Sequence, residues 1–436
     1  MDKKQFLSAA AAICAMATLV GCGSSGGTSS MKADEKQSIT VWSWDEGVKN
    51  VVAGFEKEHP NITVNVRNGG SGSDEYNALD NAIQAGKGVP DLVQFEYFAL
   101  PLFAMPGKLA DLGELGADKI KDDYTKAAWD DVSVNDKVYA LPYDYGSLTM
   151  FYNKDTFAKA GITEAPKTWD EYYEAAKKIK ALGDNYYIVN DGSDHIFNLL
   201  ALIWQAGGRP FKVDGESVTI DFHDEGSEKA IQFWDKMIKE GLIDTKMTNW
   251  SDEWNRGLND GSLASQINGG WLVSSLPDRA PDQAGKFVVS QIPQWSGSEN
   301  VSSELGGSSY AIPAKSEHKE AAYQFLEYMT HGAGVETRVE ERNALVPNLS
   351  VLKDSQWLSK KTDYYGDQEF NKTLSEVAQS VGTGWQFPPF MQYGRSTFDD
   401  DASDYYNNKQ GNLQDVVDAW AQEMIAYGNK QGFKVS

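Results

Sequence analysis

Cysteine and histidine are scarce in this chain of 436 residues, which contains two Cys and five His. Cys14 lies in an apolar N-terminal run and Cys22 follows that run after Gly21, so neither is expected to form a disulfide in the folded part. The histidines are scattered along the sequence, without the close spacing that a zinc site needs. We therefore expect a fold that rests on its hydrophobic core, with no metal and no cofactor.

Positive charge is also in short supply: 40 Lys and Arg stand against 63 Asp and Glu, and the formal net charge is −23 at pH 7. A chain of this sign repels phosphate backbones, so nucleic acid is excluded as an expected partner, and anionic lipid head groups are a poor one. Aromatic residues are abundant instead, at 12% of the sequence with 13 Trp and 20 Tyr. Unlike the charge, this abundance indicates a class of ligand.

Long apolar runs are absent after the first residues, and the single early run, FLSAAAAICAMATLV (6–20), is too short to span a bilayer. With the short charged start before it, the run predicts a secretion signal. Residues 19–22, LVGC, resemble a lipobox, in which Cys22 carries a lipid and becomes the first residue of the mature protein. We therefore expect a signal peptide at 1–21, a Gly/Ser-rich tether at 22–37, and an extracytoplasmic protein anchored to the cell membrane through Cys22. The alternative is an ordinary signal with an incidental cysteine.

Strand-like and helix-like patterns alternate after the tether. ITVWSW (39–44) and VPDLVQFE (89–96) are typical of strands, whereas KTWDEYYEAAKKIKALG (167–183) has helical spacing and a capping box of Thr168 and Glu171. This alternation favours an α/β fold with largely parallel sheets, and the length favours two domains. Ligands in such folds bind beyond the carboxyl ends of the strands, so the loops that follow the strands should line one cleft.

These loops combine aromatic rings with carboxylates, amides and an arginine. SWDEG places Trp44, Asp45 and Glu46 after the first strand, and NGGW places Trp271 after two glycines. A sugar ring has an apolar face that stacks on an aromatic ring, and hydroxyls that need paired donors and acceptors. The pattern therefore indicates a neutral, polyhydroxylated ligand. The alternative for any one aromatic is core packing, which is the better interpretation of Trp42 inside the strand.

One long stretch carries a family resemblance. YALPYDYGSLTMFYNKDTFAKAGITEAPKTWDEYYEAAKKI (139–179) closely resembles extracellular solute-binding proteins of the maltose-binding-like family, and FEKEHPNITV, INGGW and GGSSYAIPAKSEHKEAAYQFLEYM follow in the family's order. The resemblance implies a type II periplasmic-binding-protein-like fold, with two α/β lobes that close on the ligand about a hinge of three crossings. The implied N-terminal lobe comprises 38–144 and 289–329, and the C-terminal lobe comprises 145–288 and 330–436. The crossings are expected near 143–146, 288–291 and 329–332.

The resemblance also implies the function. It indicates a monomeric, non-catalytic lipoprotein of an ABC transporter that captures a di- to tetrasaccharide and delivers it to the permease subunits in the membrane. The ligand contacts that carry over lie mainly in loops after strands. The Pro-containing segment at 385–395, which we expect not to be a regular helix, departs from the family pattern, and we choose Trp385 and Phe390 there for stacking and Arg395 for a hydroxyl. These predicted ligand-binding residues are Trp44, Asp45, Glu46, Glu96, Tyr97, Asp144, Tyr145, His195, Asn198 (or Phe197), Trp271, Gly307, Ser308, Trp385, Phe390 and Arg395. A structural role is an equal alternative for His195.

Two other classes stay open at this point. A secreted glycoside hydrolase needs two carboxylates at a set separation, and acids are abundant although no catalytic motif occurs. The second class is a binding protein for another solute, such as a polyamine, a peptide or a metal ion. The acidic surface, or paired tyrosines such as Tyr405 and Tyr406, would suit such a solute. DDDASD (399–404) lacks the glycine and the distal Glu of a calcium loop, so we interpret it as a solvated face.

Overall fold

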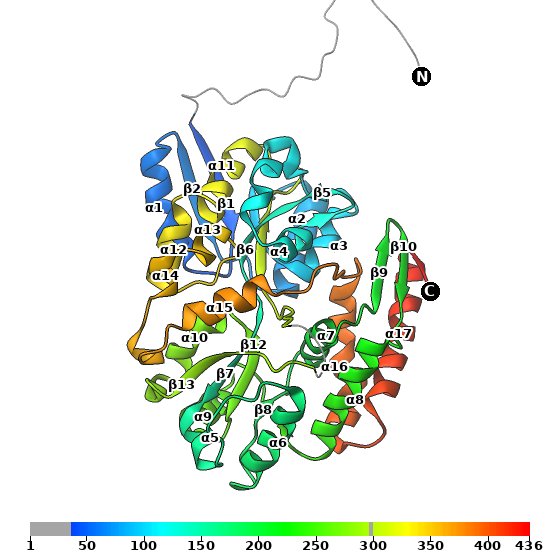
Figure 1. Ribbon diagram of the computed structural model, residues 1–436. Coiled ribbons are helices and arrows are strands. Elements are labelled where there is room, and N and C mark those ends of the chain that lie inside the picture. Colours follow the sequence, from blue (N-terminus) through cyan, green and yellow to red (C-terminus); the bar gives the residue numbers. More distant parts are fainter. Residues whose placement is uncertain (1–35, 296–299) are drawn as a thin grey trace, which may run out of the picture. The chain divides into compact units, whose positions relative to one another are not determined.

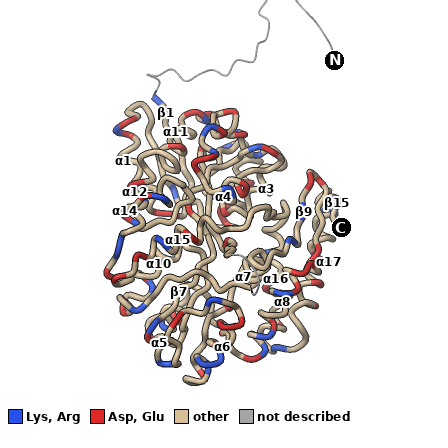
Figure 2. Tube along the Cα trace, viewed as in Figure 1, with Lys and Arg blue, Asp and Glu red and all other residues tan. Residues whose placement is uncertain are grey.

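The computed structural model describes residues 36–295 and 300–436 (Figure 1). The expected signal peptide, the expected lipidation residue Cys22 and nearly all of the expected tether lie outside these residues. Within them, no helix combines the length and the apolar character that a membrane crossing requires. In the view of Figure 2, acidic and basic residues are interspersed over the whole fold, so the excess of negative charge is distributed.

A five-stranded sheet, in the order β2-β1-β3-β14-β6, forms the centre of what we call the first half. β1 (Gln37–Trp42), β2 (Ile62–Arg67) and β3 (Leu92–Glu96) run parallel. β14 (Ser308–Ala311) lies antiparallel between β3 and β6 (Ala140–Asp144). β14 follows β6 only after a long excursion of the chain, so the chain leaves this half and returns to it.

Helices pack on this sheet, and they are α1 (Val48–Glu58), α2 (Ser73–Ala85), α3 (Leu100–Ala104), α4 (Lys126–Asp131), α11 (Lys319–Thr330) and α12 (Gly334–Arg342). Phe55 of α1 meets Phe325 of α11 edge to face, with 5.0 Å between ring centroids. α12 packs against both α1 and α11. Residues up to Arg342 therefore pack with the first half, and we propose that the crossing expected near 329–332 lies later in the chain.

A three-stranded antiparallel sheet forms the centre of the second half. β7 (Leu148–Asn153) lies in the middle, with β12 (Ser265–Gly269) on one side and β13 (Phe287–Gln291) on the other. Because β13 pairs along its full length with β7, residues 287–291 belong to this sheet. We therefore propose that the crossing expected at 288–291 lies in the segment between β13 and β14.

The remaining elements complete the second half and its edges. Its helices are α5 (Lys154–Lys159), α6 (Trp169–Lys180), α7 (His195–Gln205), α8 (Glu225–Lys239), α9 (Asp252–Asp260), α10 (Leu272–Arg279), α15 (Phe370–Gln379), α16 (Met391–Asn408) and α17 (Leu413–Lys430). The short elements of both halves are β4 (Ser133–Val134), β5 (Lys137–Val138), β8 (Val189–Asn190), β9 (Phe211–Asp214), β10 (Ser217–Ile220), β11 (Ile243–Asp244), β15 (Lys434–Val435), α13 (Leu349–Leu352), α14 (Ser355–Leu358), η1 (Tyr97–Ala99), η2 (Leu112–Leu115), η3 (Ala117–Asp123), η4 (Pro281–Gln283) and η5 (Asp363–Tyr365). α7, α8, α16 and α17 pack against one another, and α15 packs on β7 and β13, so the chain has returned to the second half by α15 (Figure 1).

Local sequence signals explain where two helices begin. Thr168 caps α6 as predicted, because its hydroxyl accepts the N–H of Glu171 at 3.1 Å. The Glu171 carboxylate in turn accepts the N–H of Lys167 at 2.6 Å. The expectation of no regular helix at 385–395 is wrong for its second part, because α16 begins at Met391, directly after the two prolines and Phe390. Proline is tolerated at positions just before a helix, so the two prolines are compatible with the start of α16.

The segment between β6 and β7 and the segment between β13 and β14 are in backbone contact. We take these two segments as the first two crossings. The N–H of Leu305 donates to the carbonyl of Gly146 at 2.8 Å, and Ser147 forms a bridge with Glu304. A Cβ atom on Gly146 would lie 2.4 Å from the carbonyl oxygen of Gly306, so only glycine permits this approach. We propose that the two lobes divide at these crossings, with 38–144 and 145–288 assigned as the sequence indicates.

Replacing Gly146 with alanine should destabilise the protein, because the added methyl group overlaps the Gly306 backbone and would force the crossings apart. We expect the free energy of unfolding, measured with urea, to fall by roughly 1–3 kcal/mol. Gly54→Ala in α1 is the matched control, since its Cβ would meet only the Tyr328 side chain and alanine favours a helix by about 1 kcal/mol. A Gly146→Ala protein as stable as wild type would contradict the close packing of the crossings.

Candidate ligand-binding site

A cavity of about 1140 Å³ is lined by residues of both halves. Its wall contains the ends of β3 and β6, the turn after β1, the start of α7, the turn between β12 and α10, and parts of α12 and α16. The loops after the strands thus meet in one place, as the pattern of strands and helices predicted. Most of the predicted ligand residues line this cavity, namely Trp44, Asp45, Glu96, Tyr97, Asp144, Asn198, Trp271, Gly307, Ser308 and Arg395. Their role as ligand contacts stays a prediction.

The buried side chain of Gln94 on β3 holds the first loop of the site in position. Its Oε1 accepts the Ser43 hydroxyl at 2.9 Å and the N–H groups of Trp44 and Asp45 at 3.2 and 3.3 Å. Its Nε2 donates to the hydroxyl of Ser308 at 2.9 Å. One amide therefore joins the turn after β1 to the start of β14, and it holds the Trp44–Asp45 backbone at the cavity wall.

A buried arginine that the sequence did not indicate lies on the same wall. Arg338 of α12 donates from Nη2 to the carbonyl of Tyr143 at 2.8 Å, and its guanidinium lies 3.3 Å from the centroid of the Tyr143 ring. The Tyr143 hydroxyl donates to Asp45 at 2.7 Å. The buried Nε and Nη1 atoms of Arg338 have no hydrogen-bond partner among the described residues. Buried donors that lack a partner carry a desolvation cost that a ligand acceptor would relieve.

Asp144, at the end of β6, has an unusual environment for a carboxylate. Its Oδ1 accepts the N–H of Ser308 at 2.5 Å and the Ser308 hydroxyl at 3.0 Å. Burial raises the pKa of Asp144 to about 6, and the nearby Asp45 adds to the shift, while Arg338 and the Ser308 bonds oppose it. This carboxyl group therefore titrates within a mildly acidic range.

Two indole rings form an aromatic wall. Trp271, after β12, donates from Nε1 to the carbonyl of Leu305 at 3.0 Å. Trp250, which the sequence analysis missed, also lines the cavity, and its ring lies 5.8 Å from that of Trp271 with 27° between the planes. The only local signal at Trp250 is its place just before the helix-capping Ser251, which says nothing about a cavity.

Arg395 on α16 is held by carboxylates from both halves. Its Nε donates to Asp194 at 2.9 Å, and its Nη1 lies 3.4 Å from both oxygens of Glu96 at the end of β3. Burial raises the pKa of Glu96, and the Arg395 charge opposes that rise. The guanidinium also lies 5.5 Å from the rings of Phe98 and Phe197, which contact each other at 4.7 Å. This cluster joins the two halves at one side of the cavity.

Three predicted ligand residues make packing contacts in the second half and are not part of the cavity lining. The His195 ring is stacked on Tyr406 at 3.7 Å, and its Nδ1 lies 3.2 Å from the buried Asp191. The Asp191 carboxylate raises the pKa of His195 against the effect of burial. Trp385 stacks on Trp204, and Phe390 packs against Phe433, at 4.9 and 5.6 Å between ring centroids.

Two further predicted residues also lie off the lining. Tyr145 is fully buried at the first crossing. Glu46 pairs with Lys49 at the start of α1, where both side chains are exposed. Both residues adjoin lining residues in sequence, so the loop assignment placed them near the site without deciding which way their side chains point.

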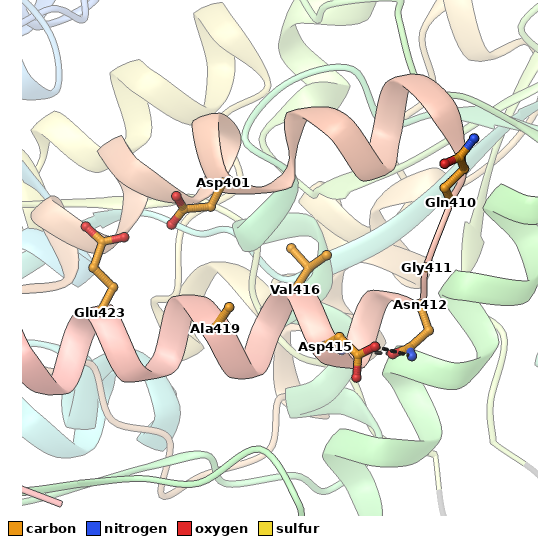
Figure 3. A pocket seen from close by; sticks show the side chains of 8 residues that line it. All are labelled: Asp401, Gln410, Gly411, Asn412, Asp415, Val416, Ala419 and Glu423. Atoms are coloured by element: carbon orange, nitrogen blue, oxygen red, sulfur yellow. Dashed lines mark hydrogen bonds between the residues drawn. The ribbon is translucent and has the colours of Figure 1, made fainter.

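A second cavity, of about 360 Å³, lies between α16 and α17 (Figure 3). The carboxylates of Asp401 and Glu423 face one another across it. Burial, with the neighbouring Glu423 adding to its effect, raises the pKa of Asp401 to about 6. Its lining contains no aromatic ring. No group of three or more His, Cys, Asp or Glu suited to a metal ion occurs in 36–295 or 300–436. The first cavity is the candidate site, because most of the predicted ligand residues line it.

Comparisons with known proteins agree with this architecture. A family model described as bacterial extracellular solute-binding protein matches residues 42–332. An ABC transporter associated binding protein from B. animalis subsp. lactis Bl-04, solved in complex with β-1,6-galactobiose, is 40% identical with a TM-score of 0.82, over 92% of this chain and 100% of that one. The expected periplasmic-binding-protein-like fold is thereby confirmed.

Two further relatives cover most of the chain. The galacto-N-biose/lacto-N-biose I-binding protein of the ABC transporter from Bifidobacterium longum, solved with lacto-N-biose, is 26% identical with a TM-score of 0.79, over 92% of this chain and 98% of that one. A lactose-binding protein from Rhizobium radiobacter is 25% identical over 403 residues, which are 89% of this chain and 87% of the relative.

Proposed function

Since this chain belongs to the bacterial extracellular solute-binding proteins, we propose that it is the substrate-binding protein of an ABC importer for oligosaccharides. The observation that carries the proposal is one cavity in which near-parallel indoles accompany buried carboxylates and a buried arginine with unpaired donors. Flat rings suit the apolar face of a sugar, and the polar groups suit its hydroxyls. The protein acts as a monomer that binds its ligand without chemical change and delivers it to a membrane permease.

The ligand we propose is a di- to tetrasaccharide that contains galactose. The sugars named for the three relatives, β-1,6-galactobiose, lacto-N-biose and lactose, each include a galactose unit. A cavity of about 1140 Å³ exceeds the range of roughly 300–1000 Å³ that is usual for small-molecule sites, so it has room for more than one ring. β-1,6-Galactobiose and lactose are therefore the first ligands to test.

Each polar group of the site has a defined part in this proposal. Asp45 and Asp144 accept hydrogen bonds from sugar hydroxyls, and Nε and Nη1 of Arg338 donate to sugar oxygens. Trp271 stacks on one ring. A sugar that leaves one of these buried groups unpaired would lose about 1–3 kcal/mol of binding free energy, which is the basis of selectivity in a neutral ligand. Closure of the two lobes brings these groups together around the sugar.

Titration calorimetry with β-1,6-galactobiose and lactose tests the proposal, with spermidine, a peptide mixture and zinc chloride as non-sugar arms. We expect saturable heat with at least one sugar and none with the non-sugar solutes. The incubated sugars are then separated by chromatography and should be recovered intact. Heat only with a non-sugar solute would reject the carbohydrate assignment, and cleaved products would identify the protein as a glycoside hydrolase.

Trp271→Ala should weaken sugar binding strongly, because the indole supplies a stacking face on the cavity wall. We expect at least a roughly tenfold loss of affinity by calorimetry, with a nearly unchanged melting temperature. Trp129→Ala is the control, since Trp129 is a partly exposed indole outside the cavity lining. A large fall in melting temperature with intact affinity would reassign Trp271 to structural packing.

Sugar affinity should fall below pH 6. The pKa of Asp144 is raised to about 6, so its carboxylate gains a proton as the pH falls through that value and loses capacity to accept a hydroxyl. At pH 5 such a group is ionised in roughly one molecule in ten, so the affinity should be about tenfold lower at pH 5 than at pH 8. Asp144→Asn should bind more weakly at pH 8 and lose most of this dependence. Equal affinity of the wild type at both pH values would contradict the role of Asp144.

The membrane anchor is a further part of the proposal, supported by the LVGC motif at 19–22 and the Gly/Ser-rich tether. Cys22→Ser should release the protein from the membrane fraction of cells that produce it, because no residue remains to carry the lipid. Cys14→Ser, which changes the neighbouring cysteine only, should leave the protein in the membrane fraction. Cell fractionation and immunoblotting measure both outcomes, and membrane retention of the Cys22→Ser protein would exclude lipidation at this residue.

A further inference from the structure

Trp250 occupies an unusual position for a large apolar side chain. Among the described residues it is the one large hydrophobic residue that is exposed, at 45%. Exposed indole surface loses the free energy that burial would contribute, about 25 cal/mol per Å². Trp250 also lines the cavity. The chain therefore leaves part of an indole uncovered at the site, where a ligand could cover it.

The backbone at Trp250 is held in a strained conformation. Its φ is 70°, in the left-handed region that a bulky side chain rarely adopts. Such a backbone conformation costs on the order of 1–3 kcal/mol and persists only where the surrounding structure fixes it. Residues of this kind cluster at functional sites. The surroundings here do determine it: Nδ2 of Asn190 donates to the Met247 carbonyl at 2.9 Å and to Oδ1 of Asn249 at 2.7 Å. The hydroxyl of Ser251 caps α9 by accepting the N–H of Trp254 at 3.1 Å.

The ring of Trp250 is oriented by its neighbours. It contacts the ring of the buried Trp254 at 5.2 Å, and the guanidinium carbon of Arg279 lies 5.1 Å from its centroid. Trp254 is itself anchored, since its Nε1 donates to Gln266 at 3.2 Å. The Trp250 ring is stacked on that of Trp271, with 5.8 Å between the centroids and 27° between the planes, so the two indoles form one aromatic pair at the cavity. Arg279 also lines the cavity and brings donors to this end of the wall.

We propose that Trp250 is an outer stacking subsite, which holds a sugar ring beyond the ring that meets Trp271 and makes the protein prefer a trisaccharide over a disaccharide. The inference rests on the proposed sugar-binding function and assigns the length of its ligand. Trp271 is the less exposed of the two indoles, and it donates a hydrogen bond to the carbonyl of Leu305 in the second crossing. We therefore assign it to the inner ring of the sugar. Trp250, exposed and beside Arg279, then meets the outer ring, whose hydroxyls the guanidinium can reach.

The test compares β-1,6-galactobiose with β-1,6-galactotriose by titration calorimetry. Trp250→Gly removes the ring, and glycine adopts the positive φ freely, so this variant should fold and melt at or above the wild-type temperature. We expect the wild type to bind the trisaccharide more tightly than the disaccharide. Trp250→Gly should bind the trisaccharide roughly three- to tenfold more weakly, the range expected for loss of one stacked ring, and it should lose less affinity for the disaccharide than for the trisaccharide.

Trp250→Phe keeps an aromatic ring and should retain most of the trisaccharide affinity, which separates stacking from general disturbance of the loop. Trp129→Ala, outside the cavity, should bind both sugars as the wild type does. Unchanged trisaccharide affinity of Trp250→Gly, or an equal loss for both sugars, would overturn the outer subsite while leaving the proposed function intact. A wild type that binds neither sugar, nor lactose, would overturn the proposed function and the subsite together.

Discussion

Backbone contact between the first two crossings is the constraint on which the site depends. The Leu305 N–H meets the Gly146 carbonyl at 2.8 Å, and the space there excludes even a methyl group on Gly146. Asp144 immediately precedes one crossing and Ser308 immediately follows the other, and their hydrogen bonds join the two. Because the crossings are packed this closely, the polar ends of β6 and β14 lie on the same wall as the turn after β1.

That wall holds several charged groups in a partly dehydrated environment. Burial raises the pKa values of Asp144, Glu96 and Glu304, all of which line the cavity, while Arg338 offsets the rise for Asp144 and Arg395 for Glu96. Perturbed carboxylates gathered in one cleft are typical of functional sites. Their burial costs stability, and hydrogen bonds to a ligand would recover part of that cost. The site thus has the physical character of a surface prepared for polar binding rather than of a packed core.

The two indoles and the charged wall contribute in different ways. In the proposed site, stacking of a sugar on Trp271 and Trp250 would depend on ring orientation and not on the strong negative net charge of the chain. Hydrogen bonds to Asp144 and Arg338, by contrast, would depend on protonation and on the placement of the sugar hydroxyls. Under this proposal the aromatic wall would accept many sugars, and the polar wall would select among them.

The sequence by itself determined the features that depend on neighbouring residues. The cap at Thr168, the alternation of strands with helices, and the loops that carry Trp44, Asp45 and Trp271 follow from local hydrogen bonds and from side-chain periodicity. The family resemblance added the two-lobed fold. The pairing of β13 and the packing of α12 are long-range contacts that the sequence did not indicate, and from them we propose later positions for the second and third crossings.

Only the tertiary structure decided which side chains face the cavity. Arg338 reaches it by packing on Tyr143, 195 positions away in the chain, and Gln94 reaches Ser308 across 214 positions. His195 and Trp385 were predicted from the sequence to contact the ligand, yet they are stacked on Tyr406 and Trp204 in the second half. Trp250 carried no signal, because a strained backbone and an exposed ring arise from the surroundings of a residue and not from its neighbours in the chain.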